Sequence, residues 1–524
     1  MTDVTSLAFA PSERADEDAN PFPITVACVD TGSNAIRFLI AEFLSPTGFE
    51  PAHYERVPIR LGHQVFLNGQ LSDESMDAAV EAFCGFRRQL SSMDVQHCRA
   101  VATSAVREAK NGAVLVDRIH GESGIELEVI SGSEEARLVH LAVSSRVDLS
   151  KDHWVLCDVG GGSVEVSLVD DLGMLWAESH TMGSVRLLEV LSGSDSDPKR
   201  FQRLLTEYVS VLNLPTPATY LKPAGFIATG GNIETLSRLS ATVTEETPVS
   251  RLSVEDLRAS IEHLSTLSYR DKIEKLGLRD DRADVIVPAA MVYLRVAEVC
   301  GVDNILVPHV GVKEGIVLDL VDDLVARRSH EQRQTRQLTK AAVALGRRFL
   351  FDEAHGLKVA DLADSLFDQL IDLHELDHHD RLLLRAASIL HDIGLFISYK
   401  KHHRHSLYIL QELELPSLGE PDMRIIANVA RYHRKSGPAE HHLDYAKLTP
   451  PDRLRVARLA SLLRLADALD RQHMGRVRSV TARVQGPALQ LDIEGDGDLL
   501  LERWAAARKK GVFEHTFGLK VRFS

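Results

Sequence analysis

Two patterns of apolar residues divide the chain. From residue 24 to about 318, short apolar runs alternate with segments of helical spacing, which is typical of an α/β region. The segment 72–90 is predicted to form a helix that begins at Ser72, with Ser75 behind it, and another helix is predicted to start near Ser133. Strands are predicted for the runs "ITVACVD", "AIRFLIAEF", "CRAVATSAV" and "ELEVI".

The spacing changes near residue 330. Between Thr335 and Leu469 the apolar residues recur at helical spacing, as in the segment 382–390, and this predicts an all-helical domain. After Arg476 the runs "SVTARVQ", "ALQLDIEG" and "LKVRF" predict strands, with a helix at about 501–510. We therefore predict a disordered tail (1–23), two α/β domains (24–142 and 143–325), a helical domain (326–475) and a small α+β domain (476–524).

The α/β region contains an internal repeat. "VACVDTGSNAIRFLI" (26–40) and "WVLCDVGGGSVEVSL" (154–168) share an apolar strand, an Asp, one residue, a Gly, a turn of small residues with Ser, and a second apolar strand. Each copy is predicted to begin one half of a duplicated α/β unit.

Turns built of Gly and Ser leave their main-chain N–H groups open to an anion, so they predict phosphate binding. The leading carboxylates, Asp30 and Asp158, would then lie beside a phosphate, which is reasonable if a divalent cation lies between them. A third element, "GFIATGGNIETLSRL" (225–239), predicts a strand, two glycines and a helix whose N-terminus favours anions. Each element alone is explained as a tight turn, whereas three in one α/β body favour phosphate binding. The predicted phosphate-binding residues are Asp30, Gly32, Ser33, Asn34, Gly160, Gly161, Gly162, Ser163, Gly230 and Gly231.

Composition narrows the class of protein. The 524 residues are 44% hydrophobic and 26% charged, and no run approaches the ~20 apolar residues of a membrane helix. The N-terminus lacks a secretory pattern and the five cysteines lack metal or disulfide spacing, which predicts reduced cysteines in a cytoplasmic protein. The net charge of −15 argues against nucleic acid as a partner. A polyanion remains open, because basic clusters occur in "SYKKHHRHS", "RYHRKSG" and "ARKKG".

Six motifs in order resemble the exopolyphosphatase/guanosine pentaphosphate phosphatase (Ppx/GppA) family: "VDTGSNAIRFLI", "VATSAVREAKNG", "VISGSEEARLV", "DVGGGSVEVSL", "HTMGSVRLLE" and "ATGGNIETL". "HHRHSLYIL" and "ARYHRKSG" resemble the long exopolyphosphatases. The resemblance implies an α/β fold, a duplicated actin-like (ASKHA, RNase H-like) two-domain phosphatase module, followed by an all-α HD-like domain and a small α+β C-terminal domain. Thr31 and Lys313 depart from residues common in the family.

The resemblance also implies the roles of individual residues. Arg107 would bind the terminal phosphate, and Glu135 would be the general base, with Glu134 as the neighbour that could be mistaken for it. Asp158 and Glu165 would hold Mg²⁺ or Mn²⁺, and K⁺ is a further candidate cation. Water would attack the terminal phosphorus in line, without a covalent enzyme intermediate.

The helical domain resembles the HD metal-dependent phosphohydrolase fold. His355, the pair His391–Asp392 and Asp467 match its ligand set, which suits Mn, Fe, Zn or Mg. His405 and His433 stand where some HD proteins bind a second metal, whereas His374, His378 and His379 are interpreted as surface residues. Alternatively, the cluster histidines line a polyphosphate channel or only satisfy buried hydrogen bonds. A basic track for a long polyanion would consist of Lys400, Lys401, Arg404, Arg434 and Lys435.

The leading interpretation is an exopolyphosphatase that releases orthophosphate from inorganic polyphosphate. The alternative keeps the chemistry and removes the 5′ γ-phosphate of guanosine pentaphosphate (pppGpp). A sugar kinase shares the glycine hairpins but is disfavoured by Arg107 and the "SEEAR" segment, and a non-catalytic sensor is disfavoured by the intact carboxylates. The resemblance alone implies a homodimer.

Overall fold

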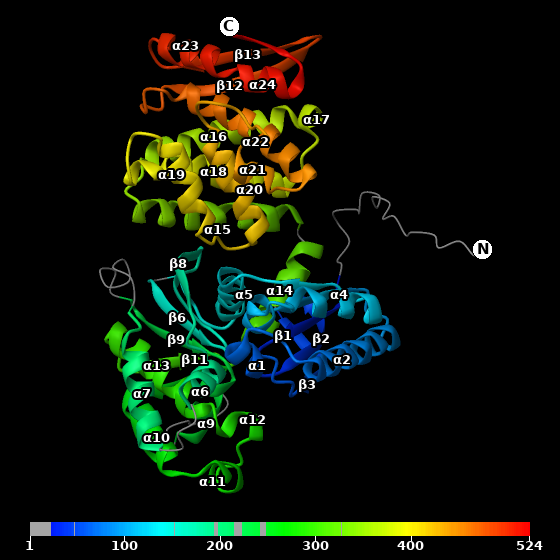
Figure 1. Ribbon diagram of the computed structural model, residues 1–524, viewed down its shortest axis with the longest axis vertical. Coiled ribbons are helices and arrows are strands. Elements are labelled where there is room, and N and C mark those ends of the chain that lie inside the picture. The colour runs from blue at the N-terminus through cyan, green and yellow to red at the C-terminus, as the bar shows by residue number, and fades with distance from the viewer. Residues whose placement is uncertain are drawn as a thin grey trace, which may run out of the picture.

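The computed structural model describes residues 22–46, 48–150, 152–192, 198–213, 223–240, 248–325 and 327–523. Most of the predicted N-terminal tail lies outside these residues. Two α/β units lie at one end of the molecule, the helical region is stacked on them, and the small C-terminal unit covers the far side of the helices (Figure 1). None of the helices in the described part of the chain has the length and apolar character that crossing a bilayer requires.

The first unit is built on a five-stranded sheet with the order β3-β2-β1-β4-β5. Strand β1 pairs antiparallel with β2 and parallel with β4, and it is buried from Val26 onward, as its continuous apolar sequence predicts. The elements are β1 (Ile24–Thr31), β2 (Ile36–Ser45), β3 (Gly48–Val57), α1 (Gly62–Asn68), α2 (Asp73–Ser92), β4 (His97–Ala102), α3 (Ser104–Glu108), α4 (Gly112–Ser123), β5 (Leu127–Val129) and α5 (Gly132–Ser144).

The second unit repeats this arrangement in a six-stranded sheet with the order β10-β11-β9-β6-β7-β8. Strand β6 pairs antiparallel with β7 and parallel with β9, so the predicted duplication is confirmed in the sheet topology. The elements are β6 (Trp154–Val159), β7 (Val164–Asp170), β8 (Gly173–His180), α6 (Ser184–Ser192), α7 (Pro198–Ser210), β9 (Gly225–Thr229), α9 (Gly231–Leu239), β10 (Ser250–Ser253), α10 (Val254–Thr266), α11 (Tyr269–Glu274), α12 (Asp280–Ala283), α13 (Ile286–Cys300), β11 (Asn304–Val307) and α14 (Val312–Val325).

Two predicted features of the first unit differ from the structure. The apolar run "CRAVATSAV" is a strand only to Ala102, and its second half is the short helix α3, which carries Arg107. Helix α14, which the predicted boundaries place in the second unit, packs against β1 of the first sheet and against α5. Pattern alone does not reveal either feature, because a buried short helix and a buried strand are both continuously apolar.

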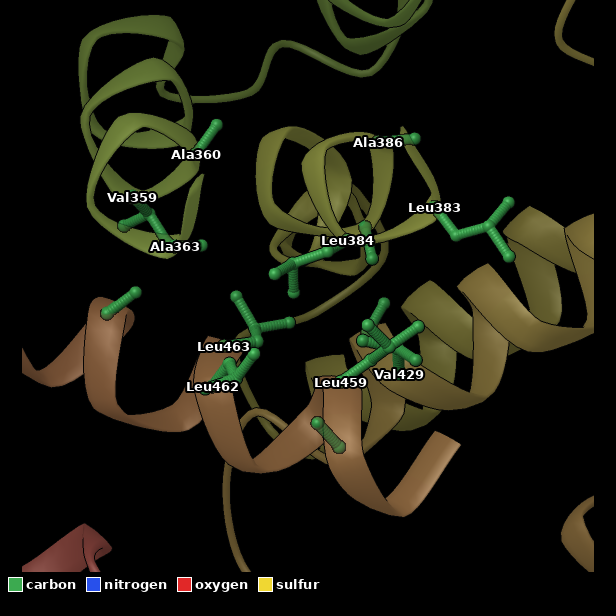
Figure 2. Close-up of a cluster of buried hydrophobic side chains, with 14 of the residues drawn as sticks. Val359, Ala360, Ala363, Leu383, Leu384, Ala386, Val429, Leu459, Leu462 and Leu463 are labelled. Atoms are coloured by element: carbon green, nitrogen blue, oxygen red, sulfur yellow. The ribbon is translucent and has the colours of Figure 1, made fainter. Parts of the chain in front are cut away.

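The helical region has a core shared by α16, α18, α20 and α22, to which Val359, Leu383, Val429 and Leu459 contribute (Figure 2). Three of these helices begin at residues whose side chains accept a backbone N–H, namely Asp352, Asp377 and Thr449. The elements are α15 (Arg327–Arg348), α16 (Glu353–Gln369), α17 (Ile371–His374), α18 (His378–Leu390), η1 (Ile393–Phe396), α19 (His402–Gln411), α20 (Glu420–Arg431), α21 (Leu443–Ala446) and α22 (Pro450–Leu469).

The C-terminal unit is a three-stranded sheet with two helices, which confirms its predicted strands. Helix α24 follows directly after the predicted helix and was not predicted, because the glycine that begins it reads as a helix end. The elements are β12 (Val477–Gln485), β13 (Ala488–Gly495), α23 (Leu500–Lys509), α24 (Gly511–Phe517) and β14 (Lys520–Phe523).

The crossing of α14 and α5 requires a glycine. A Cβ atom at Gly315 would overlap the carbonyl oxygen of Leu138, which belongs to the rigid backbone of α5. We therefore expect Gly315→Ala to lower the free energy of unfolding by about 2 kcal/mol, measured by urea unfolding followed by tryptophan fluorescence. Gly121→Ala on α4 is the control, since open space surrounds that position, and it should leave stability unchanged or slightly raised. Equal stability of the two variants would contradict the close crossing.

Candidate active site

The turns of the two repeated hairpins meet face to face. In each turn the glycine of the Asp-x-Gly motif closes the loop by a backbone hydrogen bond. Gly32 N–H donates to Ala35 O at 3.2 Å, and Gly160 N–H donates to Ser163 O at 3.0 Å. A Cβ atom on Gly161 would lie 2.9 Å from Ser33 Cβ, and one on Gly162 would overlap the Phe66 ring. The run of glycines is thus explained by backbone packing between the two units.

A cleft of about 580 Å³ lies beside these turns. Eight of the ten predicted phosphate-binding residues line it: Asp30, Gly32, Ser33, Asn34, Gly160, Gly161, Gly230 and Gly231. Gly162 and Ser163 do not line it, so their phosphate-binding role stays a prediction. Gly162 is covered by Phe66 and Ser104, and the buried Ser163 hydroxyl bonds to Glu165.

Glycine at position 230 allows the segment 225–239, with the N-terminus of α9, to lie close to the second hairpin. Its φ of +100° is unfavourable for other residues, and a Cβ there would lie 3.2 Å from Asp158 Oδ1. The N-terminus of α9 therefore approaches the second hairpin closely, as the strand–glycine–helix pattern predicts.

Three buried carboxylates gather beside the second hairpin. Glu135, Asp158 and Glu165 each offer an oxygen within 4.8 Å of the others. Asp158 faces Glu165 across the β6–β7 ladder, whereas its counterpart Asp30 faces Arg37 across β1–β2 and pairs with it at 2.7 Å. The two copies of the repeat thus differ in charge, and the unbalanced negative charge lies at the second copy.

Burial governs the protonation of this cluster. Burial raises the pKa of Glu165 to about 7, with Asp158 adding to the shift and the Ser163 and Ser179 hydroxyls opposing it. The pKa of Glu135 is raised further above its ordinary value by burial and by Glu165, and Arg107 opposes this rise. Glu135 Oε2 and Glu165 Oε2 are buried without a hydrogen-bond partner. Carboxylate oxygens with these properties fit Mg²⁺ or Mn²⁺.

The geometry separates the two candidate bases on α5. Glu134 pairs with Arg137 at 2.7 Å and with Arg99 at 3.2 Å, away from the cleft, whereas Glu135 lines it. Arg107 Nη1 lies 3.8 Å from Glu135 Oε2 and donates to the Ile130 carbonyl at 2.6 Å. Arg107 is therefore adjacent to the predicted base but is not in the cleft wall.

Sequence reasoning missed the cationic wall of the cleft. Arg238 donates to the Thr235 hydroxyl, and Arg282 donates to the same hydroxyl and to the Gly231 carbonyl. Within the described ranges neither arginine forms an ion pair with a carboxylate. Their charge is therefore available to an anion in the cleft. The local sequence around Arg282 does not indicate a basic surface, because two aspartates stand between Arg279 and Arg282 and offset their charge. The full set of lining cations is Arg37, Arg56, Arg238, Arg279, Arg282 and Lys313.

Comparisons with known proteins agree with this site. The Ppx/GppA phosphatase family model matches residues 41–324, and the model of Ppx/GppA phosphatase, domain III, matches residues 336–502. The chain belongs to the Ppx/GppA phosphatase family. Its two α/β units have the actin-like fold of this family.

Individual Ppx/GppA relatives differ in the activity that they are named for. A guanosine-5′-triphosphate,3′-diphosphate pyrophosphatase of Vibrio vulnificus is 24% identical over 89% of this chain and 91% of its own, and one of Vibrio campbellii is 26% identical over the same shares. A crystal structure of an exopolyphosphatase from Cytophaga hutchinsonii is 27% identical, with a TM-score of 0.53, and covers 57% of this chain and 98% of its own. The crystal structure of an exopolyphosphatase-like protein is 28% identical, with a TM-score of 0.52, and covers 58% of this chain and 99% of its own.

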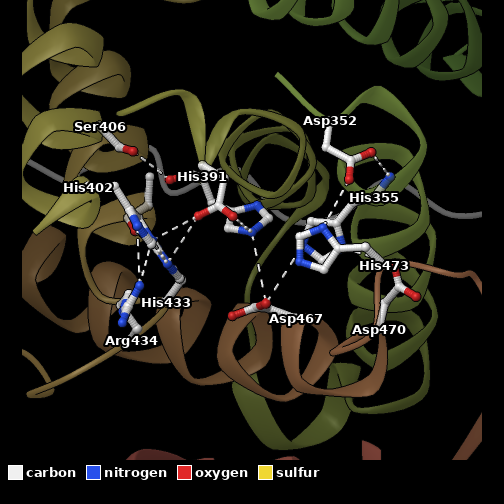
Figure 3. A network of polar contacts seen from close by, with 12 residues as sticks. Asp352, His355, His391, His402, Ser406, His433, Arg434, Asp467, Asp470 and His473 are labelled. Atoms are coloured by element: carbon white, nitrogen blue, oxygen red, sulfur yellow. Dashed lines mark hydrogen bonds and ion pairs between the residues drawn. The ribbon is translucent and has the colours of Figure 1, made fainter. Parts of the chain in front are cut away.

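The region matched by the Ppx/GppA domain III model contains a second cluster of buried ligands. We define the second cluster as His355, His391, Asp392, His402, His433 and Asp467, of which all but Asp392 are labelled in Figure 3 and are buried, whereas Asp392 is half-buried. His355 Nε2 and His391 Nε2 lie 3.8 and 3.9 Å from Asp467 Oδ1. Asp392 Oδ1 lies 3.1 Å from His402 Nε2 and 3.3 Å from His433 Nε2. The four residues predicted from the HD resemblance are therefore brought together.

The hydrogen bonds of these histidines determine which nitrogen is free. The Nδ1 atoms of His391 and His433 donate to the carbonyls of Ser388 and Ala430, and Nδ1 of His355 donates to Asp470. Their Nε2 atoms are left to face the cluster, and those of His355 and His391 have no hydrogen-bond partner. Burial lowers the pKa of His391 and His433, which keeps both imidazoles neutral and able to bind a cation. This donor set fits one or two transition-metal ions.

Two histidine predictions are corrected by the structure, and a third histidine was not predicted at all. His402, not His405, joins His433 in the second cluster, because α19 turns the side chain of His402 inward and leaves that of His405 half-buried elsewhere. His374 is fully buried rather than exposed, and its ring bonds to the backbone of Phe367 and Leu376. His473, which sequence reasoning missed, stacks on His355 with ring centroids 3.6 Å apart.

The predicted basic track does not line the cleft. Lys400, Lys401 and Arg404 lie at the start of α19, and Lys435 and Arg434 follow α20. Arg434 Nη1 lies 3.0 Å from His402 Nε2, so this end of the track borders the second cluster.

The raised pKa of Glu165 predicts a pH-dependent stability. The folded protein keeps this proton up to about pH 7, whereas an unfolded chain releases it near 4.5, so deprotonation in this range favours unfolding. We expect metal-free protein to lose thermal stability between about pH 5 and about pH 8, and Glu165→Gln to lose less. Added Mg²⁺ should raise the unfolding temperature of wild type more at the higher pH. The exposed Glu126→Gln is the control, and identical pH profiles of wild type and Glu165→Gln would refute the assignment.

Proposed function

We propose that the protein is an exopolyphosphatase that releases orthophosphate from the ends of inorganic polyphosphate. The observation that carries this proposal is the convergence, in one cleft, of two opposed glycine turns, a buried carboxylate base and a wall of arginines. Terminal phosphates need hydrogen-bond donors, positive charge and an oriented water, and the cleft residues are of the types that supply all three.

The proposed mechanism assigns a step to each group. The turns at Gly32–Asn34 and Gly160–Gly161 bind the last phosphates, and Arg238 and Arg282 neutralise their charge. Glu135 orients a water and takes its proton, since a carboxylate whose pKa is raised by burial is a stronger base. The water oxygen bonds to the terminal phosphorus while the bridging P–O bond breaks, and orthophosphate leaves. A divalent cation held by Asp158 and Glu165 would supply charge neutralisation.

Hydrolysis of pppGpp is the second candidate. The pyrophosphatases that act on this nucleotide by name match 89% of the chain, including the helical region, whereas the exopolyphosphatase structure covers 57%. The two substrates share a terminal phosphoanhydride, so the cleft residues serve either one. The length of the helical region and its basic residues favour the polymer.

An orthophosphate-release assay tests the proposal. We expect wild type to hydrolyse long polyphosphate with a higher kcat/KM than tripolyphosphate or pppGpp, and Glu135→Ala to lower kcat by about 10²- to 10⁴-fold. His391→Ala in the second cluster is the control, and it should retain hydrolysis of tripolyphosphate. A higher kcat/KM for pppGpp would establish the alternative, and absence of turnover with all three would indicate a sensor.

The basic track predicts how long chains are handled. Replacing Lys400, Lys401, Arg404, Arg434 and Lys435 by Gln should shorten the processive run on long polyphosphate, because the polymer dissociates between cuts when fewer cations hold it. Hydrolysis of short substrates should be nearly unchanged. The exposed pair Arg478→Gln and Arg483→Gln serves as a control for loss of positive charge elsewhere on the surface, with chain length followed by gel electrophoresis. Equal losses on long and short substrates would contradict the track.

A further inference from the structure

A lysine from the C-terminal unit reaches the second cluster. Lys509 is the last residue of α23, and its ammonium forms an ion pair with Oδ2 of Asp467, which lies on α22. The lysine side chain is only 18% exposed and that of Asp467 is 7% exposed, so the pair is largely removed from water. A buried ion pair of this kind holds both partners firmly, because either charge alone would be costly there.

The two oxygens of Asp467 face different cations. Oδ1 faces the Nε2 atoms of His355 and His391, where a metal ion would bind, and Oδ2 faces the Lys509 ammonium. A metal ion bound to Oδ1 would thus be separated from the Lys509 ammonium only by the carboxylate group of Asp467. Two like charges at that separation repel strongly in a buried site, where water does not screen them.

We propose that Lys509 competes with a divalent metal ion for Asp467, so that the C-terminal unit sets the metal affinity of the second cluster. The lysine neutralises the carboxylate when no metal is bound and opposes the metal ion when one enters. This inference does not depend on the substrate of the cleft, because it concerns cation binding at a separate place in the fold.

Co²⁺ binding to the metal-free full-length protein tests the proposal. Titrations followed by calorimetry and by visible absorption compare wild type, Lys509→Met and Lys509→Arg, each with and without His391→Ala. The His391-dependent part of the binding belongs to the second cluster, which separates it from the carboxylates of the cleft. We expect Lys509→Met to bind Co²⁺ at least tenfold more tightly than wild type and Lys509→Arg to bind within about threefold of it.

Arg508→Met is the matched control. It removes one positive charge from the same turn of α23, but its guanidinium lies 4.8 Å from the Trp504 ring centroid, away from Asp467. Its Co²⁺ affinity should equal that of wild type.

Thermal unfolding gives a second readout. Without metal, Lys509→Met should unfold at a lower temperature than wild type, because Asp467 loses its partner. Added Co²⁺ should remove this difference in unfolding temperature. If Lys509→Met does not fold, Lys509→Gln replaces it in both measurements. Unchanged or weaker His391-dependent binding in Lys509→Met (or in Lys509→Gln where that variant replaces it), or none in any protein, would overturn the proposal.

Discussion

The contact between the two hairpin turns is the constraint on which the candidate active site depends. Gly161 and Gly162 bring bare backbone against Ser33, Ser104 and Phe66, at separations that leave no room for a Cβ atom. The cleft walls are the ends of two separate sheets, so this contact fixes how far apart they stand. A larger residue in either turn would move one sheet away from the other. The glycines therefore act first through packing, and phosphate binding uses the space that this packing leaves.

Charge makes the two halves of the duplicated unit unequal. Both hairpins place an aspartate at the end of a central strand, but its cross-strand partner is Arg37 in one copy and Glu165 in the other. The first aspartate is neutralised within the chain by Arg37, whereas the second belongs to a group of three buried carboxylates whose charge is balanced by protonation or by a bound cation. A symmetric fold thus contains one candidate cation site in this cleft, and the proposed general base, Glu135, lies on the side where that charge is concentrated.

The helical region also removes carboxylates from water, and it balances their charge with different groups. Asp467 is buried and Asp392 half-buried among imidazoles, whose Nδ1 atoms bond to backbone carbonyls or to a carboxylate and whose Nε2 atoms face inward. Histidines that served only to satisfy buried hydrogen bonds would not leave two Nε2 atoms unpartnered. The balancing positive charge comes from Lys509, which belongs to a different unit of the fold. The C-terminal unit is thereby coupled to the helices by electrostatics as well as by apolar packing.

The sequence by itself determined the features that depend on neighbouring residues: the strands of the repeat, the cap at Ser72, the helices after residue 335, and the glycine turns with Asp30 and Asp158. Motif resemblance added Glu135 and the tetrad around His391, and the fold brought each set together. Tertiary structure alone decided which distant side chains meet. It placed Arg238 and Arg282 in the cleft, put His402 rather than His405 in the second cluster, and brought Lys509 to Asp467. Periodicity reports which face of an element is buried, whereas the partner buried against it depends on how remote segments cross, which no local pattern records.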